Sequence, residues 1–172
     1  SSRKDLAACG VLSVNSISVL LNAIRIPGSR LLLMHRLQQK IGRENLISRI
    51  LSSLFWNLGY ILSGCNIGRN AKISGGVVLP HPVGIVIGNG CVINKDCWIY
   101  QNVTVGATHR NGTLAYPVLL EGCHISPGAC VLGGITLAPR TRVGANSVLY
   151  TSTDAGAFYV GAPARKVEAS DR

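Results

Sequence analysis

An aliphatic side chain recurs every six residues from position 67 to position 149. The period is interrupted twice, by an eight-residue step from Leu79 to Ile87 and by a longer gap after Val105. The thirteen aliphatic positions are Ile67, Ile73, Leu79, Ile87, Ile93, Ile99, Val105, Leu119, Ile125, Val131, Leu137, Val143 and Leu149. Four residues after most of them stands a small or β-branched side chain, at Ala71, Val77, Cys91, Cys97, Val103, Cys123, Ala129, Ile135, Thr141 and Ser147.

A six-residue repeat with one large and one small inward side chain is typical of a flat strand followed by a turn, three of which close a triangular coil. A single strand cannot bury its inward side chains alone, whereas stacked coils enclose one continuous aliphatic column. The sequence therefore predicts a mainly β fold, a parallel β-helix shaped as a triangular prism, over residues 63–167. The twenty glycines agree with many tight corners.

The same register explains half of the cysteines. Cys91, Cys97 and Cys123 fall on the small inward position, so we expect them to be core residues. The six cysteines of the chain contain no C-x-x-C pair and no short spacing typical of a zinc module.

Residues 16–62 follow a different period, with apolar side chains three and four residues apart. This spacing predicts helices, which Pro27-Gly28 and Gly42 divide. We therefore expect a helical region (1–62), the prism (63–167) and a short tail (168–172). The sequence shows no secretory signal and no uninterrupted apolar stretch long enough to span a membrane, which predicts a cytoplasmic protein.

The net charge of +10 is spread along the chain rather than gathered in basic runs. Nucleic-acid surfaces combine basic clusters with stacking aromatic residues, and the sequence shows neither. An anionic small molecule or a membrane surface fits better. For the helical region two roles stay open: to cover the prism and assemble copies of the chain, or to contact the inner face of an anionic membrane through its basic side chains.

The six-residue period fails between residues 107 and 118, so this segment is expected to leave the prism as a loop. Loops mounted on a rigid scaffold commonly carry function. We therefore expect the loop to form a wall of the active site.

The repeat, the loop and several short segments resemble the hexapeptide-repeat acyltransferases. The resemblance extends over residues 63–167 and is closest to the serine acetyltransferases and the related sugar O-acetyltransferases of surface-polysaccharide pathways. It implies a left-handed β-helix that moves an acetyl group from acetyl-CoA to a hydroxyl group. The matching segments are IGRNAKI (67–73), HPVGIVIG (81–88), NVTVG (102–106), VGANSV (143–148) and VGAPAR (160–165).

In this family a histidine in the segment matching residues 80–84 is the general base, which corresponds to His81. An alcohol is a poor nucleophile until a group with a pKa near neutrality takes its proton, and imidazole has such a pKa. The family's carboxylate that orients this histidine corresponds to Asn66, so we expect Asn66 or a backbone carbonyl to fix the ring.

Further departures concern the acceptor. The aspartate that precedes the catalytic histidine in serine acetyltransferases is Pro80 here, and the loop's Arg-His pair corresponds to Ala115 and Tyr116. Without these charged contacts a zwitterion loses its strongest interactions, so the sequence predicts a sugar of a surface polysaccharide or its precursor as the acceptor. Serine is the alternative. The predicted acceptor-binding residues are Gln101, Asn102, His109 and Tyr116.

The resemblance also implies a trimer, or a dimer of trimers, with CoA in the groove between subunits and no metal. The small residues that correspond to the CoA site are Gly106, Ala107, Gly128, Ala129, Gly144 and Ala145. The basic residues placed to meet its phosphates are Arg140, Arg142, Arg165 and Lys166.

Two other functions fit the same prism. A zinc enzyme of the γ-carbonic-anhydrase type would use three histidines, and the chain has His81, His109 and His124. The spacing of His109 and His124 does not match the H-x-x-x-x-H pair of that family. A non-catalytic assembly module is the other alternative, which retention of His81 within its motif argues against.

Overall fold

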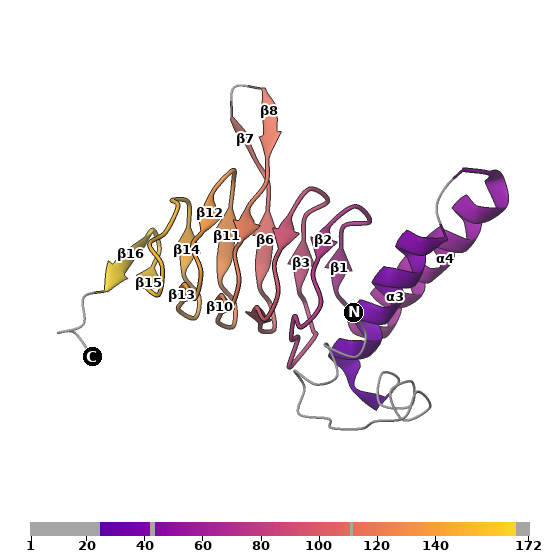
Figure 1. Ribbon diagram of the computed structural model, residues 1–172, viewed down its shortest axis with the longest axis horizontal. Helices are drawn as coiled ribbons and strands as arrows, with labels where there is room; N and C mark the ends of the chain where they lie inside the picture. Colours follow the sequence, from indigo (N-terminus) through magenta and orange to yellow (C-terminus); the bar gives the residue numbers. More distant parts are fainter. Residues whose placement is uncertain (1–24, 42–43, 111, 168–172) are drawn as a thin grey trace.

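The computed structural model describes residues 25–41, 44–110 and 112–167, so the part of the predicted helical region before residue 25 lies outside it. Two helices, α3 (Pro27–Lys40) and α4 (Leu46–Ser63), pack against each other at one end of a long prism of stacked coils (Figure 1). The prism is a left-handed parallel β-helix, as predicted.

Three parallel sheets form the faces of the prism. Face 1 contains β1 (Asn66–Ile67), β3 (Val86–Ile87), β6 (Thr104–Gly106), β11 (Cys130–Leu132) and β14 (Val148–Leu149). Face 2 contains β2 (Lys72–Ile73), β4 (Val92–Ile93), β9 (Val118–Leu119) and β12 (Thr136–Leu137). Face 3 contains β5 (Trp98–Ile99), β10 (His124–Ile125), β13 (Arg142–Val143), β15 (Phe158–Gly161) and the antiparallel β16 (Ala164–Val167).

The core of the prism consists of the side chains that the six-residue period identifies. Every predicted aliphatic position is buried except Ile73, which is partly buried, and all ten small positions are buried. Cys91, Cys97 and Cys123 are fully buried, and burial raises the pKa of Cys91 to about 11, which keeps it a protonated core residue. The predicted register is confirmed.

Helix α3 covers the open end of the prism through hydrogen bonds. His35 and Gln39 donate to the carbonyl oxygen of Ala71 at 3.1 and 2.9 Å, and Gln38 donates to that of Arg69 at 3.0 Å. From α4, Trp56 Nε1 donates to the carbonyl oxygen of Ile67 at 2.8 Å. These bonds satisfy backbone groups of the first coil that have no preceding coil to pair with.

Helix α4 has its ends fixed by local contacts but leaves one apolar side uncovered. Asn45 and Ser48 form a capping box at its start, and Gly64 ends it with a φ of 62°. The buried positions of the helix are Ser52 and Gly59. The outer α4 stripe, which is exposed among the described residues, consists of Ile47, Ile50, Leu51, Leu54, Leu58, Ile61 and Leu62.

In the part of the chain that the structure describes, neither helix combines the length and hydropathy that crossing a bilayer requires.

Candidate functional site

His81 lies where the chain turns from face 3 to face 1. The eight-residue step in the period makes this corner longer than the others, and residues 80–84 fill it before β3 begins. Pro80 and Pro82 flank the histidine, and a proline fixes its own φ and restricts the residue before it. The N–H of Val83 closes the turn on the carbonyl oxygen of His81 at 2.8 Å. The imidazole is exposed.

A cavity of about 360 Å³ adjoins His81, between this corner and the helices. Its helical wall comes from the first turn of α3 and the last residues of α4. The lining residues are Pro27, Arg30, Leu62, Ser63, Pro80, His81, Pro82 and Val83. A base that faces a cavity of this size has the geometry needed to take a proton from a bound hydroxyl group.

Gly28 sets the distance between α3 and the corner that carries His81. A Cβ atom at this position would collide with the carbonyl oxygen of Leu79, two residues before the histidine. Only a glycine allows this close approach of the helix backbone. The glycine therefore fixes the width of the cavity.

Asn66, the predicted orienting residue, lies on β1 with its side chain exposed. Its N–H donates to the carbonyl oxygen of Ile85 at 2.8 Å, which places β1 beside the strand that follows the His81 corner. Among the described residues, no hydrogen bond joins the Asn66 side chain to the imidazole.

The predicted loop is a hairpin that projects from the prism between faces 1 and 2 (Figure 1). It consists of β7 (Thr108–Arg110) and β8 (Thr113–Ala115). His109 lines a hollow of about 380 Å³ at its base, together with Ala115, Gly134 and Tyr150. The hairpin and His81 thus occupy different corners of one chain, with face 1 between them.

The other predicted acceptor residues take part in packing. The Tyr116 ring lies over Gly88 and Gly90, where a larger side chain would collide with it, and is partly buried against the core. Asn102 adopts a φ of 56° at the next turn from face 3 to face 1, and its side chain lies over Gly84. The Oε1 atom of Gln101 is buried and has no hydrogen-bond partner in the described structure.

The small residues predicted to bind CoA lie at two corners. Gly106 and Ala107 precede the hairpin, whereas Gly128 and Ala145 lie at the turns from face 3 to face 1. The Ala129 side chain is fully buried, and its N–H and carbonyl groups bond to Ser126 and Thr104. Its contact with CoA stays a prediction. Gly144 is also buried.

The predicted phosphate-binding residues gather towards the C-terminal end of the prism. Arg142 lies on β13 with its guanidinium 5.1 Å from the Phe158 ring centroid, and Arg165 and Lys166 lie on β16 of the same face. Lys166 bonds Asp154 at 3.0 Å. Arg140 stands at the neighbouring corner, with a φ of 58°.

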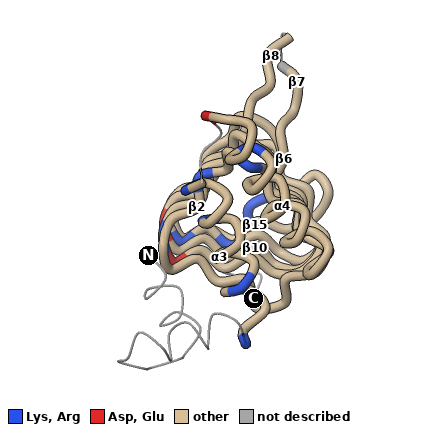
Figure 2. Tube along the Cα trace, turned by 90° about the vertical axis from the view of Figure 1, so that its right-hand side faces the viewer, with Lys and Arg blue, Asp and Glu red and all other residues tan. Residues whose placement is uncertain are grey.

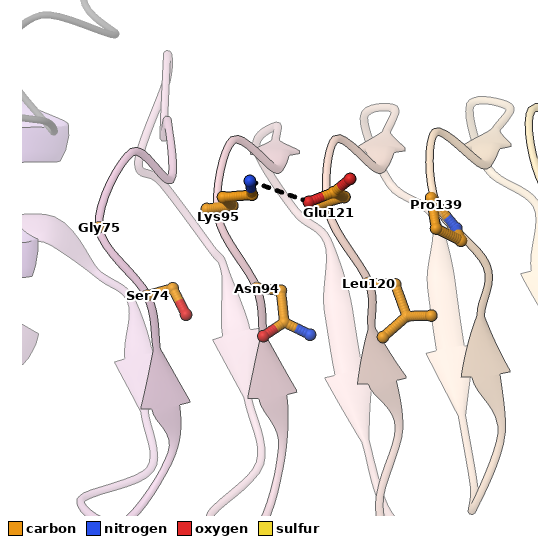
Figure 3. Close-up of a pocket in the computed structure, with 7 residues that line it drawn as sticks. All are labelled: Ser74, Gly75, Asn94, Lys95, Leu120, Glu121 and Pro139. Atoms are coloured by element: carbon orange, nitrogen blue, oxygen red, sulfur yellow. Dashed lines mark ion pairs between the residues drawn. The ribbon is translucent and has the colours of Figure 1, made fainter.

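A larger hollow, of about 610 Å³, follows the corner between faces 2 and 3 (Figure 3). Its two charged side chains, Lys95 and Glu121, form an exposed ion pair with an N–O distance of 3.1 Å. None of the residues that line it is a predicted site residue. The His81 cavity, although smaller, contains the chemically competent group, and we assign the site there.

The three histidines of the zinc alternative do not meet in one chain. His124 lies on face 3 and stacks on Trp98, with ring centroids 5.7 Å apart, whereas His109 lies on the hairpin between faces 1 and 2. Burial, and then the charge of Arg142, lowers the pKa of His124. Across the described residues, no three His, Cys, Asp or Glu side chains are grouped as metal ligands.

Three residues at the His81 cavity were not predicted from the sequence: Arg30 and Ser63, which line it, and Gly28, which fixes its width. From the sequence, Gly28 was predicted only to break a helix. The contacts of all three depend on how the helices dock on the prism, which the local sequence pattern does not specify.

Known proteins provide an independent comparison. A serine acetyltransferase of Helicobacter pylori strain J99 is 34% identical over 143 residues, which cover 82% of this chain and 81% of the relative. One of Synechococcus elongatus is 32% identical over 143 residues, again 82% of this chain but 57% of the relative. This chain thus spans less than two thirds of some curated relatives. No protein-family model matches it.

Among solved structures, a serine acetyltransferase in complex with CoA superposes with a TM-score of 0.72 and 31% identity, over 82% of this chain and 57% of that one. This superposition includes the prism fold. The chain belongs to the serine acetyltransferase family of left-handed β-helix acyltransferases.

Proposed function

We propose that the protein is an acetyl-CoA-dependent O-acetyltransferase in which His81 is the general base. The observation that carries this proposal is the exposed imidazole at the edge of a cavity of about 360 Å³, on the family's scaffold. The relatives' names and the solved complex with CoA support acetyl-CoA as the donor.

In the proposed reaction His81 takes the proton of the acceptor hydroxyl as its oxygen attacks the acetyl carbonyl carbon. The new C–O bond forms, the C–S bond of the thioester breaks, and the proton passes from the imidazolium to the departing sulfur. Pro80 and Pro82 restrict the backbone that carries the imidazole, and among the described residues no carboxylate contacts the ring. Asn66 is the proposed partner of the ring in the bound state.

The acceptor is a hydroxyl compound, for which the sequence predicted a sugar. The named relatives support serine, the alternative, better than a sugar. The missing charged contacts at Pro80, Asn66, Ala115 and Tyr116 are the remaining argument for a different acceptor. Both compounds belong in the same assay.

We further propose that the active unit is a homotrimer or a dimer of trimers. Two features support this assembly. The hairpin and His81 lie at different corners of one chain, so that a second copy is needed to bring a hairpin to each His81. The outer α4 stripe offers an apolar surface to such contacts.

The test of the proposed reaction is release of CoA thiol and formation of the O-acetyl product, measured with serine and with a panel of sugars. We expect His81→Ala to lower kcat by roughly 10²- to 10⁴-fold. The matched control is His124→Gln, which removes a histidine that stacks on Trp98 and does not line the cavity. Equal turnover by the wild type and the His81→Ala variant would refute the proposed role.

A further inference from the structure

The one fixed charge among the described residues that line the His81 cavity is positive. Arg30 and His81 are its only ionisable lining residues among those described, and no carboxylate lines it. Between residues 25 and 95 the sequence contains a single acidic residue, Glu44. Glu44 precedes α4, whereas the cavity adjoins the other end of that helix, about 27 Å away at 1.5 Å per residue.

The Arg30 guanidinium is available for a ligand. It is half-buried and makes no ion pair or hydrogen bond to the described residues. A guanidinium presents its donors in a planar fork that matches a carboxylate or phosphate group. Removing this cation from water without a partner costs free energy, which an acidic ligand group would offset.

The start of α3 adds to the same potential. Pro27 and Arg30, which lie in the first turn of this 14-residue helix, both line the cavity. The first turn contains no acidic residue, and Ile26 at the N-cap provides no side-chain hydrogen bond. The positive end of the helix dipole therefore faces the cavity uncompensated. Viewed from the helical end of the molecule, Lys and Arg outnumber Asp and Glu along the chain (Figure 2).

From these observations we infer that Arg30 binds an acidic group of the acceptor, a carboxylate or a phosphate, while His81 takes the proton of its hydroxyl. The inference rests on the proposed acetyl transfer and narrows its acceptor. A neutral sugar has no acidic group to pair with the Arg30 guanidinium. An ammonium group is disfavoured, because the described cavity offers it no carboxylate and two sources of positive charge.

A series of three-carbon acceptors tests this charge selection. Glycerol, glycerate, glycerol 3-phosphate, serine and serinol all present a primary hydroxyl, but differ in whether they carry an acidic group, an ammonium group, both or neither. We expect kcat/KM to be higher for glycerate or glycerol 3-phosphate than for glycerol, and lowest for serinol. Which of the two acids is preferred distinguishes a carboxylate from a phosphate site.

Substitution of Arg30 connects the selection to this residue. Arg30→Gln is expected to lower kcat/KM for the acids by roughly tenfold or more, the value of a charged hydrogen bond, and to lower that for glycerol by a much smaller factor. Arg30→Lys retains the charge and restores part of the loss. The control is Lys40→Gln, which removes a charge from the exposed last turn of the same helix, about 15 Å along its axis.

A binding measurement separates this inference from the proposed reaction. The ring resonances of His81 are followed by NMR as glycerate, glycerol 3-phosphate or glycerol is added. Saturable shifts with the acids that disappear in Arg30→Gln support the acidic-group site even if none of these compounds is acetylated. Acetyl transfer with equal preference for glycerol and the acids, or shifts that persist in Arg30→Gln, would overturn the inference and leave the proposed reaction intact.

Discussion

His81 is positioned by its immediate neighbours in the chain rather than by a charged partner. The two prolines restrict the corner backbone, and the Val83 N–H closes it on the histidine's own carbonyl oxygen. Gly28 then brings α3 against Leu79, two residues away. At the residue scale, the position of His81 thus depends on backbone geometry. Substitutions that change the backbone at Gly28 or at the corner should therefore disturb the site.

Gly28→Ala tests this dependence. The added methyl group would meet the Leu79 carbonyl oxygen, so α3 has to move away from the corner. We expect a loss of about 1–3 kcal/mol in the free energy of unfolding and a fall in kcat/KM. The control is Gly59→Ala, where the new Cβ meets ordinary contacts at 3.7 Å and removal of a helical glycine favours the fold. Equal stability of Gly28→Ala and the wild type, measured by denaturant titration, would contradict this account.

Helix α3 is attached to the prism mainly by side chains that donate to backbone carbonyl oxygens. His35 is central to this attachment. Because the carbonyl oxygen of Ala71 can only accept a hydrogen bond, Nε2 of His35 carries the proton. Its Nδ1 lies 3.4 Å from Nε2 of Gln38. Burial, the largest effect, lowers the pKa of His35. The hydrogen bond to the Ala71 carbonyl oxygen opposes this shift, and the charge of Arg36 adds to it. At the scale of elements, α3 is attached to the prism through the neutral imidazole of its own His35.

This attachment predicts a loss of stability in acid. The pKa of His35 is lowered on folding. As the pH falls to about 6.5 and lower, the unfolded chain therefore takes up a proton at this residue, whereas the folded chain does not. The free energy of unfolding should therefore fall as pH drops below about 6.5, by at most about 1.4 kcal/mol per pH unit. His35→Gln should flatten this part of the profile, and His109→Gln on the exposed hairpin should not. Thermal unfolding between pH 5 and 8 measures both.

At the scale of the whole molecule, the six-residue period determined the prism, its core and the excursion of the hairpin, because each depends on which side chains point inward. The same register placed the Ala129 side chain in the core, where the structure has it. The six-residue period does not predict how α3 and α4 dock on the His81 corner. Arg30 and Ser63 were missed for that reason. Contacts between copies of the chain are equally absent from it.

The outer α4 stripe makes the proposed assembly testable. Leu54 is 58% exposed, and Leu54→Glu places a charge in the middle of the stripe. We expect this variant to have a lower molecular mass than the wild type in light scattering, since a buried unpaired carboxylate opposes association. The control is Asn57→Glu, an exposed polar position of the same helix.

A monomeric wild type would contradict the proposed assembly. In that case flotation of the intact chain with anionic vesicles tests the membrane alternative, with Leu54→Glu as the variant that should remain unbound.

At the two ends of the column the parallel pairing of coils stops. At one end α3 occupies the carbonyl groups of the first coil, and at the other β16 runs antiparallel to β15. Parallel coils pair readily with further identical coils, and an open terminus is a template on which another chain can continue the ladder. The helical cap at one end and the reversed strand direction of β16 at the other interrupt the parallel ladder on which such continuation depends.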